Sequence, residues 1–210
     1  MLGRTHVSIG FLALTVISPP VVWPGVTHDK ALLAFAASLV AVTVGSLAPD
    51  MDQPGSTLPR RVAGPFGANR IMSLIGGVGA IYLNSRYHIS SYLNLAGIIL
   101  LVMALIKHRG ITHSIFGVLG AWYAIKALQG DPLYVHYVGF NIVHPFMVGY
   151  IAHICADFFS DHGIAPLYPI WKKHIRMPIV HIVTSGFLDK VFINYAAFLV
   201  GIMRAFKLSL

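Results

Sequence analysis

Long apolar runs separated by short polar segments dominate this chain. Three runs contain no Asp, Glu, Lys or Arg and approach the roughly 20 residues of a membrane-spanning helix: 7–23, 31–49 and 89–106. Four more are shorter or contain histidine: 71–83, 111–125, 138–159 and 191–203. Because backbone polar groups must be paired in lipid, such continuous runs predict helices, and they lack the alternation typical of barrel strands. The pattern predicts an all-α fold, a polytopic membrane bundle of about six or seven helices.

Composition agrees with a membrane protein. The chain is 56% hydrophobic and 10% charged, and its mean hydropathy is +0.73, unlike a soluble domain of this length. The first run follows Arg4, but no small-residue cleavage site closes it, so we expect a retained first helix. No repeat, linker or low-complexity tract divides the sequence, which predicts a single domain over residues 1–210.

Polar residues gather where the predicted helices begin or end. If the chain crosses the bilayer at each run in turn, four polar clusters reach the same side. They are His6, "PDMD" at 49–52, "HRGITHS" at 108–114 and "HICADFFSDHG" at 153–163. Ionisable residues are costly in membrane helices and usually functional. The convergence therefore predicts a functional site at one membrane face.

Charge predicts which face this is. With the same counting of crossings, ten Lys and Arg residues lie on the side of the clusters and five on the other. The positive-inside rule then places the clusters at the cytoplasmic face. The formal net charge of +8 fits this orientation and contact with anionic lipids. Nucleic-acid binding is not expected, because the basic residues are scattered over loops.

In two of the clusters, carboxylates lie at the end of a predicted helix. His153 and Asp157 are four residues apart, so on a helix they share one face and can reach one ion. Asp50 and Asp52 follow a proline, where an extended turn can aim both carboxylates inward. Each pair alone also fits a structural role, such as capping a helix. Together they predict a shared metal site.

Histidines complete the predicted donor set. His108 and His113 would point in different directions on one continuous helix, so we expect Gly110 to allow a bend that brings both inward. His6 adds a third imidazole. Imidazole and carboxylate without thiolate suit a divalent metal, with zinc expected first and manganese as the alternative. The same "HRGITHS" segment also fits an interfacial loop whose Thr112 or Ser114 caps a helix.

The motifs "PDMDQPGS", "HRGITHS" and "GYIAHICADFFSDHGIAPLYPIWKKHIRMPI" resemble those of the YdjM-like family of membrane-bound metal-dependent hydrolases. The likeness runs in order from His6 to about Asp189 and covers most of the chain. It implies an inner-membrane enzyme with distant kinship to zinc-dependent phospholipase C. Carried over by motif, the implied metal ligands are His6, Asp50, Asp52, His108, His113, His153 and Asp157.

The chain departs from the family pattern in two places. Ser160 stands where family members tend to have threonine, which keeps the hydroxyl. Asp189 stands where the family often has glutamate, and the chain contains no glutamate at all. Asp161 is an alternative carboxylate nearby.

These residues predict metal-dependent hydrolysis of a phosphoester. A metal-activated water would attack the phosphorus, and Asp50 or Asp52 would bridge two ions or act as general base. Arg109 is the expected phosphate clamp, because a guanidinium binds phosphate in a bidentate manner. Residues expected to support the ligands are Thr112, Ser114, Ser160, Asp161 and Asp189. At a membrane face, the expected partners are membrane lipids, and the expected substrate is a lipid headgroup or lipid-linked phosphate.

Two other functions use the same residues. A non-catalytic membrane adaptor with a structural metal would have closed coordination without a position for water. A metal or ion transporter would place polar residues near the bilayer midplane and towards both sides. The clusters at one end of the predicted helices favour the hydrolase.

Overall fold

The computed structural model describes residues 3–17, 28–50, 68–105, 110–137, 139–161, 163–178, 186 and 193–205. All regular elements in these ranges are helical, and Ile164 and Ile175 form an isolated antiparallel bridge. The prediction of an all-α fold is confirmed for this part of the chain. The elements are α1 (Gly3–Ile17), α2 (His28–Leu47), η1 (Ala48–Asp50), α4 (Ala68–Tyr87), α5 (Ser91–Leu105), η3 (Ile111–His113), α6 (Ile115–Gln129), α7 (Pro132–Tyr137), α8 (Val143–Phe158) and α9 (Asn194–Ala205).

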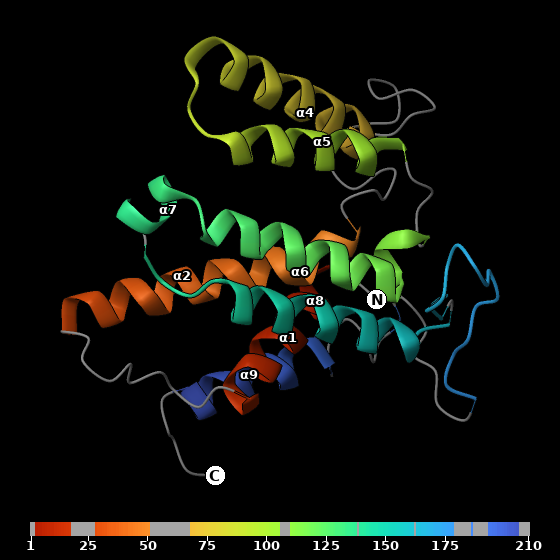
Figure 1. The fold of residues 1–210 in the computed structure, drawn as a ribbon. Coiled ribbons are helices and arrows are strands. Elements are labelled where there is room, and N and C mark those ends of the chain that lie inside the picture. Colours follow the sequence, from red (N-terminus) through yellow and green to blue (C-terminus); the bar gives the residue numbers. More distant parts are fainter. Residues whose placement is uncertain are drawn as a thin grey trace.

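The helices stack in layers around α8 (Figure 1). α8 packs against α1, α2 and α6, and α9 lies against α1 on the outside. α4 and α5 form an antiparallel hairpin above α6, with α5 nearer to it (Figure 1). The core cluster beside α8 contains Phe146 and Tyr150 together with Ala41 and Ala48.

Small residues allow the backbones of α1, α2 and α8 to meet. A Cβ atom added at Gly149 of α8 would lie 2.3 Å from the Val42 carbonyl oxygen of α2. One added at Gly45 would lie 2.1 Å from the Phe146 carbonyl oxygen. Gly10 brings α1 to the same crossing, where its added Cβ would lie 3.4 Å from the Gly149 Cα. Such close contacts between helices depend on small side chains, and they fix α2 relative to α8 near the polar end of the bundle.

Predicted helix bounds differ from the structure where a polar residue redirects the backbone. The run 111–125 divides into η3 and α6, because Ser114 is extended and its side chain accepts a hydrogen bond from the Gly117 amide. His113 therefore lies before the α-helix and not within it. The run 138–159 is helical only from Val143 to Phe158, because Gly139 near its start has a φ of +65°, outside helical geometry.

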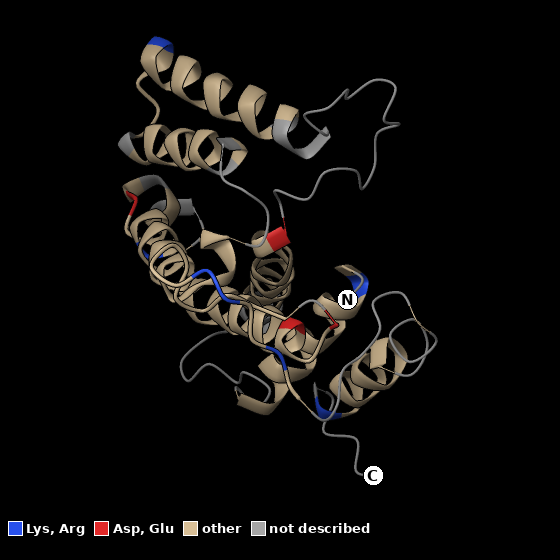
Figure 2. Ribbon diagram, turned by 90° about the vertical axis from the view of Figure 1, so that its right-hand side faces the viewer, with Lys and Arg blue, Asp and Glu red and all other residues tan. Residues whose placement is uncertain are grey.

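The outer surface is strongly apolar. Figure 2 shows helices almost free of charge, with charged residues at their ends and connections. Many large apolar side chains point outward, among them Val40 and Leu119, 63% and 57% exposed. Within the described residues, one helical stretch, Leu33–Asp50, is both long and apolar enough to cross a membrane; shorter apolar helices are Gly3–Ile17, Tyr92–Val102 and Ile115–Gln129. The number of crossings stays a prediction.

Candidate metal centre

Four side chains from three distant segments meet at one end of the bundle. They are Asp50 of η1, His113 of η3, and His153 and Asp157 of α8. Each offers one ligand atom, and these atoms all lie within 4.8 Å of one another. α2 and α8 deliver their residues at their C-terminal ends, while His113 directly precedes the start of α6. The group could hold a metal ion.

The spacing of these atoms matches that of ligands around one ion. His113 Nε2 lies 3.3 Å from Asp157 Oδ2 and 3.5 Å from Asp50 Oδ1. His153 Nε2 lies 3.3 Å from His113 Nε2, 3.7 Å from Asp50 Oδ1 and 3.8 Å from Asp157 Oδ2. Ligands held about 2.1 Å from a tetrahedral ion are about 3.4 Å apart. The contacts are longer than good hydrogen bonds, so the donor set fits a metal better than a hydrogen-bonded cluster.

A backbone carbonyl orients His153. Its Nδ1 lies 2.7 Å from the Ser46 carbonyl oxygen in the last turn of α2, where carbonyls lack partners within the helix. A carbonyl only accepts, so Nδ1 donates the proton and the Nε2 of a neutral imidazole directs its lone pair to the cluster. Partners of this kind fix the tautomer and ring orientation of metal-binding histidines.

His6 extends the cluster on the far side of Asp157. Its Nε2 lies 3.3 Å from Asp157 Oδ1, and its ring stacks on that of His153 with centroids 3.8 Å apart. The two oxygens of Asp157 thus face different histidines: Oδ1 faces His6, and Oδ2 faces His113 and His153. Among the described carboxylates of the cluster, Asp157 has the placement of a bridging ligand, which the sequence assigned to Asp50 or Asp52.

Burial differs among the members of the cluster. The side chains of His6, His113, His153 and Asp157 are fully buried, whereas that of Asp50 is 14% exposed. Burial by itself lowers the pKa of His113, but the neighbouring carboxylates of Asp157 and Asp50 outweigh it, and the net shift is upward. The site therefore concentrates negative charge that favours a cation, and Asp50 is its least buried member, although its Oδ1 is buried.

Four of the five residues expected to support the ligands are described: Thr112, Ser114, Ser160 and Asp161. Thr112 Oγ1 lies 3.1 Å from His113 Nδ1 and can orient that ring. Ser114 caps α6, and its hydroxyl also donates to the Ile111 carbonyl at 2.7 Å. The Ser160 hydroxyl donates to the Asp157 backbone carbonyl at 2.8 Å, which closes the end of α8. Asp161 lies outside the cluster, and its backbone carbonyl accepts from Arg176 at 3.1 Å.

The structure therefore unites five of the seven sequence-predicted ligands: His6, Asp50, His113, His153 and Asp157. The predicted ligands Asp52 and His108, the predicted clamp Arg109 and the predicted supporting residue Asp189 lie outside the described residues. Sequence reasoning missed Ser46, because a backbone carbonyl leaves no mark in the residue type. It also missed Gly149, whose role depends on a helix distant in sequence.

Comparison with known proteins gives one match. The model of a family described as YdjM inner membrane protein matches residues 1–208. No curated protein and no solved structure gives a significant match.

Proposed function

We propose that this chain, which belongs to the YdjM inner membrane protein family, is a metal-dependent hydrolase that cleaves a phosphoester at the membrane surface. One observation carries the proposal. Two imidazole nitrogens and two carboxylate oxygens, brought together from three separate segments, lie at the mutual spacing of metal ligands. A helical protein buries such a group at considerable cost unless a cation compensates the carboxylates.

The donor set suits zinc, with manganese as the alternative, because it combines imidazole and carboxylate. Asp50, His113, His153 and Asp157 would hold the ion. When bound, a divalent ion polarises a phosphoryl oxygen and lowers the pKa of water towards about 7. His6, placed against the other oxygen of Asp157, would serve a second ion completed by Asp52 or His108.

Each of several groups of the protein would have a separate role. The Ser46 carbonyl keeps His153 in one tautomer, so its Nε2 stays available. The buried Asp157 neutralises positive charge from both sides. Asp50 is the least buried member of the cluster, and its carboxylate oxygen that does not hold the ion would accept a proton as the general base. Arg109 stands two residues before Ile111, the first residue of η3, in the sequence and is proposed as the phosphate clamp.

The membrane setting favours a lipid substrate. We propose a multi-pass arrangement with the centre at the cytoplasmic face, since the basic residues of the sequence favour that side. A site there meets lipid headgroups and lipid-linked phosphates directly. The described ligands lie at one end of the helices rather than along them, which supports hydrolysis over transport.

Metal content and hydrolysis together test the proposal. Elemental mass spectrometry on detergent-purified protein should find at least one tightly bound zinc or manganese per chain. His153→Ala and Asp50→Ala should lose the metal and at least about 100-fold of the activity on phosphodiester and lipid-phosphate substrates, more than a supporting residue would cost. His144→Ala is the matched control, because His144 lies on the same helix away from the cluster.

The control should keep both metal and activity. Wild-type protein that is metal-free after chelator-free purification would reject the ligand assignment. Metal retained in the wild type, without hydrolysis of any phosphoester tested, would reject the enzymatic role and favour the structural-metal adaptor.

A further inference from the structure

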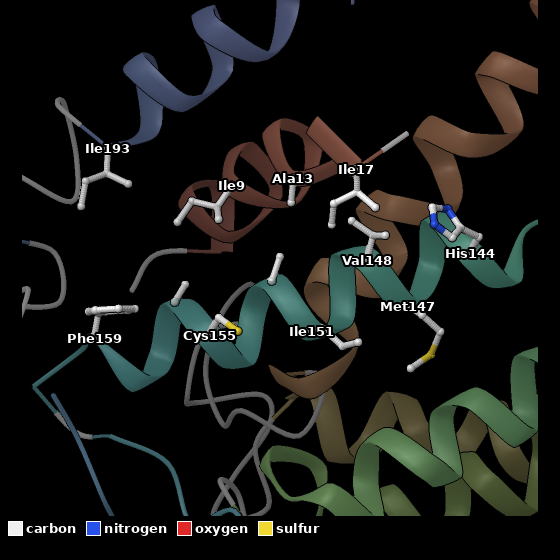
Figure 3. A pocket seen from close by; sticks show the side chains of 12 residues that line it. Ile9, Ala13, Ile17, His144, Met147, Val148, Ile151, Cys155, Phe159 and Ile193 are labelled. Carbon is white, nitrogen blue, oxygen red and sulfur yellow. The ribbon is translucent and has the colours of Figure 1, made fainter. Parts of the chain in front are cut away.

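Two apolar hollows run along the helices. One lies between α1 and α8, has a volume of about 600 Å³ and is lined by residues such as Ile9, Val148 and Cys155 (Figure 3). The other lies between α5 and α6, and α2 and α8 contribute to its wall; its volume is about 530 Å³. We call this second hollow the α5–α6 groove. It is lined by residues that include Ala48, Ile98, Val102, Thr112, Phe116, Gly120 and Ala124.

The α5–α6 groove borders the metal centre beside Asp50 and His113. Ala48, two residues before Asp50, forms part of its wall, and so does Thr112, the neighbour of His113. Asp50 and His113 lie 3.5 Å apart, and Asp50 is the partly exposed ligand. The α1–α8 hollow borders the cluster through Ala152 and Ala156, the neighbours of His153 and Asp157, and the side chains of these two ligands are fully buried. Of these two hollows, the α5–α6 groove is therefore the one beside the partly exposed ligand.

Its length suits a hydrocarbon chain. α6 has 15 residues and extends about 22 Å at 1.5 Å per residue, while one leaflet of a bilayer core is about 15 Å thick. Groove residues continue along α6 from Phe116 to Leu128. Small side chains on this face, Gly120 and Ala124, leave the space open.

The chemistry of the wall also favours a hydrocarbon chain over a peptide. Hydroxyl groups come only from Tyr92, Thr112 and Tyr150 among its residues, and the Tyr150 hydroxyl already donates to the Thr112 carbonyl at 2.7 Å. A peptide seated there would bring backbone polar groups that the apolar wall cannot pair. An acyl chain has no such requirement.

We propose that the α5–α6 groove holds an acyl chain of the substrate, a phospholipid whose phosphate is thereby presented to the metal centre. The presentation of the phosphate to the metal centre rests on the proposed hydrolase function. The seat for the acyl chain rests on the groove alone.

Gly120 provides the test. A Cβ added there meets nothing within 4 Å, and Gly120 lines the groove, so a larger side chain begins in open space and projects into the groove. Gly79 of α4 has the same open space and lies outside the groove, which makes Gly79→Leu the matched control. Leucine is a better helix former than glycine, so both variants should fold. Ala124→Leu, one turn further along the groove, gives a second block.

The probe is phosphatidic acid with a photoreactive group at the end of one acyl chain, used in phosphatidylcholine vesicles containing the full chain. Mass spectrometry should map crosslinks to groove residues such as Ile98, Val102 and Phe116 in the wild type and in Gly79→Leu. Gly120→Leu and Ala124→Leu should lose at least about tenfold of these crosslinks. Equal crosslinking in all variants, or crosslinks confined to outward residues of α4 such as Ile75, would overturn the proposal.

Hydrolysis separates this proposal from the hydrolase proposal. Both proposals would be supported if Gly120→Leu and Ala124→Leu no longer hydrolyse long-chain lipids but still hydrolyse water-soluble phosphodiesters. Crosslinks that depend on Gly120, in a protein without any hydrolysis, would support the acyl-chain seat and reject the enzyme. Hydrolysis of long-chain lipid that is unaffected by Gly120→Leu would reject the seat and keep the enzyme.

Discussion

Replacing Gly149 with alanine should weaken metal binding, although Gly149 supplies no ligand. Gly149 lies on α8 one turn before His153, where α8 touches the backbone of α2. The added methyl group would lie 2.3 Å from the Val42 carbonyl oxygen and 2.9 Å from the Ser46 amide nitrogen. Both contacts are with backbone atoms, so no side-chain rotation relieves them. α8 must move away from α2, and the hydrogen bond from His153 to Ser46 must lengthen.

The size of the effect follows from these distances. The contact with Val42 has to lengthen from 2.3 Å to at least 3.4 Å, a displacement of about 1 Å to reach ordinary van der Waals separation. Starting from 2.7 Å, the His153 hydrogen bond would then exceed useful length. Loss of such a supporting contact typically costs about 10–100-fold in metal affinity, or about 1.4–2.8 kcal/mol. Overpacking should also cost about 1–3 kcal/mol of stability.

Zinc affinity measured by competition with a chelator, alongside thermal unfolding, tests this reasoning. Gly120→Ala is the matched control, because its methyl group meets nothing within 4 Å. It should keep wild-type affinity and gain about 0.5–1 kcal/mol from helix propensity. A folded Gly149→Ala protein with wild-type zinc affinity would refute the role of the α2–α8 contact in orienting His153.

Three further predictions concern residues around the centre. Acid should weaken metal binding, since histidines bind only as neutral imidazoles; because the neighbouring carboxylates raise the pKa of His113, protons should compete for this ligand at a higher pH than for an ordinary histidine, as measured by zinc affinity against pH. Ser114→Ala removes the cap of α6 and should cost about 1 kcal/mol of stability with metal content unchanged in elemental analysis. Tyr150→Phe leaves the Thr112 carbonyl without the donor at 2.7 Å; it should cost about 1–3 kcal/mol in denaturant unfolding and lower zinc affinity by loosening η3.

The local parts of the centre were predictable from sequence. The spacing of four between His153 and Asp157 places both on one helix face, and the structure has them there on α8. The meeting of Asp50 with these residues followed from counting apolar runs, because helix ends on one side of a bundle lie near each other. Gly110 has a non-helical backbone (φ −88°, ψ −112°), but His108 lies outside the described residues, so the bend expected to bring both histidines inward stays a prediction.

The non-local parts were not predictable. The function of Gly149 depends on how closely α2 approaches, which no periodicity in α8 records. The two-sided position of Asp157 depends on the exact placement of His6 on α1, so sequence assigned the bridging role to Asp50 or Asp52 instead. The α5–α6 groove arises from the separation of two helices, and the apolar residues of its wall have the same pattern as residues that pack tightly.

Water access to a bound ion distinguishes a catalytic centre from a structural one. A structural metal is enclosed by protein ligands, whereas a catalytic metal keeps a position for water. In this chain Asp50 is 14% exposed while the other three ligands are fully buried, so a position for water would lie on the side of Asp50. With Mn²⁺ bound, the centre should therefore enhance the relaxation of water protons through direct exchange, and inorganic phosphate should reduce that enhancement by taking the open position. Bound manganese without any enhancement would identify a closed site and the adaptor function. If phosphate leaves the enhancement unchanged, the ion has an open position for water, but a phosphoester is not the ligand that occupies it.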